Sequence, residues 1–183
     1  MSRRAVIAGW ALVAVVAASA IHSGVVGALR FDRMGPLGVG REVPEFRVPL
    51  VDGGEFRRAD LPGRVHVVTF WATWCPYCRD ELDDLQAMAD RWPDDAVRIV
   101  AVNREGGGVS VGEAMVMARQ YRDAKGLGFG IGVDDGRMGK AFGVGGIPHT
   151  VVFDRTGRLR EVFQGRVSGE RIAGVIDAVV AER

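Results

Sequence analysis

The sequence predicts an α/β fold in which a central mixed sheet is sandwiched between helices. Runs of β-branched apolar residues at 65–70 and 97–102 are typical of buried strands. The stretch after the first run, 79–92, carries apolar residues at three- and four-residue spacing, which indicates one face of a helix. The chain has 183 residues, 48% of them hydrophobic, which is enough to form the core of one domain with a terminal extension.

The extension is the N-terminal segment 1–30. Residues 5–29 are uncharged and mostly apolar, and a helix of this length spans about 37 Å, enough to cross a bilayer. We expect either an uncleaved signal-anchor or a signal peptide cleaved after the small residues 18–20. Because Arg3 and Arg4 precede the apolar run, both alternatives place the following domain outside the cytoplasm.

The rest of the chain divides into a linker at 31–42 and a domain at 43–183. Residues 31–40 contain three glycines and a proline, which favours a linker. Beyond residue 30 the chain carries 21 basic and 23 acidic side chains, a net charge of −2. This balance argues against a nucleic-acid partner.

Turn and cap signals give the remaining elements of the domain in order. The glycine turn 52–54 predicts an N-terminal hairpin, and Ser110 with Glu113 forms a capping box that opens a helix. Ser168 is expected to cap a last helix. Between these signals we predict a strand at 129–133, a helical segment at 135–142, and a hairpin of strands 150–153 and 159–163.

The only two cysteines, Cys75 and Cys78, lie where the first buried strand ends and a helix begins. A helix N-terminus carries unpaired N–H groups and partial positive charge, both of which favour a thiolate. The three-residue spacing also brings the two sulfurs close enough to form a bond. A structural zinc site normally needs four ligands, and the chain has no second Cys-x-x-Cys and only three histidines. The pattern therefore favours redox chemistry over metal binding.

Four separated stretches carry a resemblance to a known family. They are Val43-Pro44-Glu45-Phe46, Trp71-Ala72-Thr73-Trp74-Cys75-Pro76-Tyr77-Cys78, Ile99-Val100-Ala101-Val102-Asn103 and Gly146-Ile147-Pro148-His149-Thr150. Together they are similar to the thioredoxin-like superfamily, and to its membrane-anchored extracytoplasmic thiol:disulfide reductase branch (TlpA/ResA/CcmG-like). The resemblance implies a thioredoxin-like sandwich with an N-terminal hairpin and a central insertion around 104–128.

The same resemblance implies roles for the motif residues. Cys75 would be the attacking thiolate and Cys78 the resolving thiol, while Pro76 and Tyr77 between them would tune the redox potential. Pro76 also fits the first turn of a helix, where its missing N–H costs nothing. Tyr77 is expected at the exposed rim.

Three further residues are expected to contact the substrate. The resemblance implies a cis peptide bond between Ile147 and Pro148, in a loop that faces the cysteines and offers the backbone of Ile147 to the substrate. Trp74 is expected at the rim, where it would touch the substrate, and Trp71 in the core.

Glu81 follows Cys78 by three residues on the same helix face. Its carboxylate could accept a proton during the redox cycle and tune the thiol pKa values. The alternative is a solvated glutamate that favours the N-terminal half of the helix. Thioredoxin has a buried aspartate where this chain has Thr69, which makes Glu81 more important as a proton acceptor.

The sequence thus predicts an extracytoplasmic thiol:disulfide oxidoreductase that reduces protein disulfides and requires no cofactor or resident metal. The resemblance suggests apocytochrome c as substrate and implies a membrane electron-donor protein that recharges the dithiol. Three alternatives stay open: a disulfide-forming oxidase, a copper-binding module that uses Cys75, Cys78 and His149, and a non-catalytic binding domain that would still bind its partner with both cysteines replaced by serine.

Overall fold

A computed structural model describes residues 43–182 of the protein. The predicted anchor or signal segment 1–30 and the linker 31–42 lie outside the described residues. Within 43–182, none of the helices combines the length and the apolar character that crossing a bilayer requires.

The centre of the domain is a five-stranded mixed sheet in the order β5-β4-β3-β6-β7. Strands β3, β4 and β5 are parallel, whereas β6 and β7 run antiparallel to their neighbours. The bounds are β3 Val65–Trp71, β4 Val97–Asn103, β5 Gly130–Val133, β6 His149–Phe153 and β7 Leu159–Gln164. Every residue of β3 is buried, which explains why its sequence is a nearly continuous apolar run.

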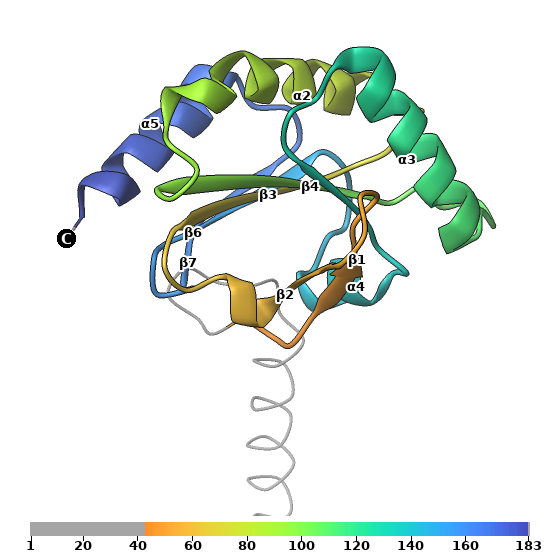
Figure 1. Cartoon of the computed structure of the whole chain (residues 1–183), viewed down its shortest axis with the longest axis horizontal. Coiled ribbons are helices and arrows are strands. Elements are labelled where there is room, and N and C mark those ends of the chain that lie inside the picture. The colour runs from red at the N-terminus through yellow and green to blue at the C-terminus, as the bar shows by residue number, and fades with distance from the viewer. Residues whose placement is uncertain (1–42, 183) are drawn as a thin grey trace, which may run out of the picture. The chain divides into compact units, whose positions relative to one another are not determined.

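Helices cover one face of the sheet, and a hairpin with one short helix covers the other (Figure 1). The first face carries α2 Pro76–Met88, α3 Val111–Lys125 and α5 Gly169–Ala181. The second face carries α4 Arg137–Ala141 and the hairpin of β1 Arg47–Pro49 and β2 Glu55–Arg57. Successive side chains of β3 alternate between the two cores, Val67 toward the helices and Val68 toward the hairpin. The predicted fold class, a mixed sheet flanked by helices with an N-terminal hairpin, is confirmed.

The predicted helix caps are confirmed in one case and corrected in another. Ser110 and Glu113 form the expected reciprocal capping box at the start of α3. Ser168 occupies the N-cap position of α5, but its side chain makes no capping hydrogen bond. Instead, the Gly169 N–H donates to Asp84 Oδ2 of α2 at 3.2 Å, so a neighbouring helix satisfies this helix end.

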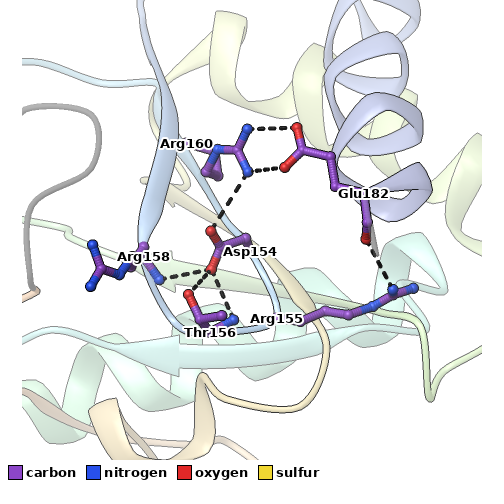
Figure 2. Close-up of polar contacts among 6 residues, drawn as sticks. All are labelled: Asp154, Arg155, Thr156, Arg158, Arg160 and Glu182. Atoms are coloured by element: carbon purple, nitrogen blue, oxygen red, sulfur yellow. Dashed lines mark hydrogen bonds and ion pairs between the residues drawn. The ribbon is translucent and has the colours of Figure 1, made fainter.

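The turn between β6 and β7 is organised by Asp154 (Figure 2). Its Oδ1 accepts hydrogen bonds from Thr156 N at 2.8 Å, Thr156 Oγ1 at 2.6 Å and Arg158 N at 3.1 Å. Arg160 lies 3.6 Å from the other carboxylate oxygen of Asp154 and also pairs with Glu182 after α5. The hairpin signal at 154–157 is therefore an aspartate-anchored turn that also holds the C-terminal helix.

Candidate active site

The two cysteines form a disulfide at the junction of β3 and α2, with their Cα atoms 5.3 Å apart. Cys75 is the N-cap residue of α2 and Pro76 follows in the first turn. The Cys78 N–H donates to Cys75 Sγ at 3.2 Å. Cys75 is 4% exposed and Cys78 is 1% exposed. After reduction, the same N–H and the helix N-terminus would favour a thiolate at Cys75.

Two aromatic side chains stand at the rim of the disulfide. Trp74 is 63% exposed and Tyr77 is 65% exposed, as expected for both. Trp71 is fully buried, and its ring lies 4.9 Å from that of Tyr121, centroid to centroid. The motif therefore divides into one core tryptophan and an exposed pair on either side of Cys75.

Glu105 holds the loop before Cys75, a role that sequence reasoning missed. Its carboxylate accepts hydrogen bonds from Thr73 N at 2.9 Å, Thr73 Oγ1 at 3.0 Å and Asn103 Nδ2 at 2.7 Å. Its backbone oxygen accepts a hydrogen bond from Trp74 Nε1 at 2.8 Å. Glu105 lies directly before three consecutive glycines, at the start of the expected insertion around 104–128, and no site residue was predicted there. The one local signal was a polar residue, Asn103, at the end of an apolar strand.

The Ile147–Pro148 peptide bond is cis, as the resemblance implied. Trp74 and Ile147 line a common groove of about 420 Å³, together with Glu105, Val109, Val144 and Asp135. The structure thus brings together two of the three residues that were predicted to contact substrate. The Pro148 carbonyl accepts a hydrogen bond from Gly165 N at 2.9 Å, which ties the loop to the residue that follows β7.

Glu81 is fully buried between α2 and the sheet, so the solvated alternative is wrong. Its Oε1 accepts hydrogen bonds from Thr150 Oγ1 at 2.6 Å and Thr69 Oγ1 at 3.1 Å. Its Oε2 lies 3.3 Å from Val167 N. Burial raises the pKa of Glu81, and the hydrogen bonds from Thr150, Val167 and Thr69 oppose that rise only in part. A buried carboxylate of this kind keeps its proton to a higher pH than a solvated one.

His149 does not belong to the cysteine site. It pairs with Phe70 across β3 and β6, and its ring packs against the Phe70 ring at 6.0 Å between centroids. Both side chains therefore face the hairpin side of the sheet, opposite to α2. Burial lowers the pKa of His149, and the nearby charge of Arg104 lowers it further. Among the described residues no cluster of three His, Cys, Asp or Glu side chains could hold a metal, so the geometry does not support the copper alternative.

Comparison with known proteins places the chain in a family. Residues 39–162 match the AhpC/TSA family, and the chain belongs to it. It is 27% identical over 150 residues to the thiol-disulfide oxidoreductase ResA of Geobacillus thermodenitrificans, covering 81% of this chain and 82% of the relative.

Solved structures of similar fold include two redox proteins. MTB dsbF superposes with a TM-score of 0.62 at 27% identity, covering 75% of this chain and 98% of that one. A thiol:disulfide interchange protein of Chlorobium tepidum TLS superposes with a TM-score of 0.63 at 24% identity, covering 79% and 99%, and supports the fold alone. The fold, the disulfide at the start of α2 and these similarities identify a thiol:disulfide oxidoreductase of thioredoxin-like fold.

Proposed function

We propose that the protein reduces disulfide bonds of other proteins outside the cytoplasm, with Cys75 as nucleophile and Cys78 as resolving thiol. One observation carries this proposal. The Cys75–Cys78 disulfide stands at the first turn of α2, where the Cys78 N–H already points at Cys75 Sγ. The groove lined by Trp74, the residue before Cys75, and by Ile147 would hold part of a polypeptide substrate.

The reduced enzyme would transfer two electrons in two exchange steps. The Cys75 thiolate attacks a substrate disulfide, forms a mixed disulfide and releases one substrate thiolate, which takes up a proton. Cys78 then gives its proton to the Glu81 carboxylate and attacks Cys75 Sγ. The second substrate thiolate leaves and is protonated. The enzyme ends as the Cys75–Cys78 disulfide, and the substrate ends as a dithiol.

The surroundings of Glu81 support the reducing direction. A strongly oxidising dithiol owes its potential to stabilisation of the reduced thiolate form. Glu81 lies one turn after Cys78 on α2, and its negative charge, when present, opposes thiolate formation nearby. A site built in this way favours the disulfide form of the enzyme, which is the product of a reductase.

The substrate, donor and location are proposed from the sequence and its resemblance. Residues 1–30 would anchor the domain in the membrane or, if cleaved, release it to the periplasmic or extracytoplasmic side. The Cys pair of apocytochrome c before haem attachment is the proposed substrate. Each cycle leaves an oxidised enzyme, so a membrane protein that delivers electrons from the cytoplasm is the proposed donor.

The reduction potential of the Cys75–Cys78 pair tests the direction. The full-length chain in mild detergent is equilibrated against glutathione and dithiothreitol buffers, and its thiols are counted after alkylation. A potential near or below that of thioredoxin, about −270 mV, is the expected result. A potential near −120 mV would overturn the reductase and favour a disulfide-forming oxidase.

Single cysteine variants test the two roles. Cys78→Ser should accumulate a mixed disulfide through Cys75 when it is mixed with a protein that carries an accessible disulfide, because the resolving thiol is missing. Cys75→Ser serves as the matched control and should accumulate none. Accumulation in Cys75→Ser but not in Cys78→Ser would reverse the assignment. The readout is a non-reducing gel with mass spectrometry of the adduct.

A further inference from the structure

The carboxylate of Glu81 is held by two hydroxyls that face each other across the sheet. Thr69 of β3 and Thr150 of β6 are register partners, and both are buried. Thr150 Oγ1 lies 2.6 Å from Glu81 Oε1 and 2.7 Å from Thr69 Oγ1, and Thr69 Oγ1 lies 3.1 Å from the same carboxylate oxygen. We propose that Thr69 and Thr150 are positioning residues that let Glu81 lose and regain a proton while it remains buried.

Thr69 and Thr150 are polar residues on a face of β3 and β6 that is otherwise apolar at the neighbouring pair. Two residues along the same ladder, Val67 and Val152 are also register partners, and both pack in the core beneath the helices. Valine and threonine have nearly the same shape, so packing alone does not require a hydroxyl at the Thr69–Thr150 pair. What the hydroxyls add is hydrogen bonding to Glu81 in a place where burial penalises its charge.

Hydroxyls suit a group that changes its protonation state. A hydroxyl can donate to the ionised carboxylate and, after rotation, accept from the protonated carboxyl. The third partner, the Val167 N–H, can only donate. The two threonines are therefore the partners of Glu81 that can serve both states of the proposed cycle.

Among the described residues, no charged group around Glu81 supplies the hydrogen bonds that Thr69 and Thr150 give to its carboxylate. Arg166, in the segment between β7 and α5, acts on Glu81 through its charge and is the least of the influences on its pKa. Its guanidinium is already paired with Asp84 of α2 at 2.9 Å. On α2 itself, Cys78 is the titratable neighbour one turn before Glu81. The histidines at positions 66 and 149 face the hairpin side of the sheet, where each ring packs against a phenylalanine.

This inference rests on the proposed proton-accepting role of Glu81, and Thr150→Val tests it. Removing the nearest donor should raise the pH at which Glu81 ionises. The pH profile of the exchange rate should move upward by about one pH unit, because a hydrogen bond to a charged group is lost. Thr150→Ser keeps the hydroxyl and should behave like the wild type. Thr156→Val removes a threonine hydroxyl from the β6–β7 turn and should leave Glu81 unchanged.

Ionisation of Glu81 is read directly in the oxidised full-length chain from the pH dependence of its ¹³C carboxyl resonance. The resonance is assigned by its absence in Glu81→Gln. Thr69→Val repeats the test from the other strand if Thr150→Val does not fold. A titration that is unchanged, or moved downward, in the valine variants overturns the inference whatever the activity. A further outcome is that the titration moves upward in the valine variants while Glu81→Gln is as active as the wild type. That combination supports the role of the two hydroxyls and overturns the proton-accepting role of Glu81.

Discussion

Two carboxylates near opposite ends of β6 have pKa values that are shifted in opposite directions. Glu81 lies at the cysteine end and touches Thr150, and Asp154 follows the other end. Each has a threonine hydroxyl within 2.6 Å. Burial raises the pKa of Glu81, and its hydrogen bonds do not compensate. Burial is also the largest single influence on Asp154, yet its hydrogen bonds and Arg160 together hold its pKa below the usual value.

The difference lies in the partners and in access to water. Asp154 Oδ1 accepts two backbone N–H groups and one hydroxyl, and its other oxygen faces Arg160 (Figure 2). Glu81 has one backbone N–H at 3.3 Å, and Arg166, the arginine whose charge acts on it, is paired with Asp84. The donors around Asp154 thus lower its pKa, whereas the fewer donors around the buried Glu81 leave its pKa raised.

The largest expected difference between Glu81 and Asp154 is in the rate of thiol–disulfide exchange. Glu81→Gln removes the proposed proton acceptor and should lower the rate at pH 7 by about 100-fold, the lower end of what a positioned acid or base contributes. Asp154→Asn is the matched control, because it removes the carboxylate that follows β6, at the opposite end of this strand from Thr150. It should leave the rate within about twofold, because Asp154 contacts neither the cysteines nor Glu81 and its loss affects the stability of the turn rather than the exchange step.

The measurement is stopped-flow reduction of a protein disulfide, followed by tryptophan fluorescence from pH 5 to 9. The wild-type rate should rise with pH as Glu81 ionises, and Glu81→Gln should lose that limb. Equal rates in wild type and Glu81→Gln across this range would show that Glu81 is not the acceptor.

The sequence predicted those parts of the site that depend on neighbours in the chain. Cys75, Pro76 and Cys78 were assigned correctly to a helix start because cap position, proline and spacing are local signals. The contacts of Glu105 with Thr73 and of Glu81 with Thr150 join residues 32 and 69 positions apart. No periodicity records such pairs, because they arise only once the sheet brings β3 beside β4 and β6.

The effect of pH on stability should have opposite signs for the two carboxylates. A lowered folded pKa means that Asp154 stabilises the fold above its ordinary pKa, and that this contribution is lost as pH falls through the folded value. Asp154→Asn should therefore reduce the free energy of unfolding at pH 7 by about 1–2 kcal/mol, with a smaller loss at pH 3. A raised folded pKa means that the contribution of Glu81 is present below its ordinary pKa and is lost as pH rises through the folded value.

The difference in free energy of unfolding between Glu81→Gln and wild type should consequently change with pH. From pH 4 to pH 8 it should shift by about 1 kcal/mol in favour of the variant, because the variant buries no charge. Urea denaturation of the oxidised proteins at pH 3, 4, 7 and 8 measures both variants, and equal m-values ensure that the same transition is compared. If Glu81→Gln lost stability as pH rose, in parallel with Asp154→Asn, the carboxylate of Glu81 would be stabilising the fold as an anion. Both carboxylates would then stabilise the fold as anions and differ only in how much they do so. The raised pKa of Glu81, and with it the proposed proton-accepting role, would be overturned.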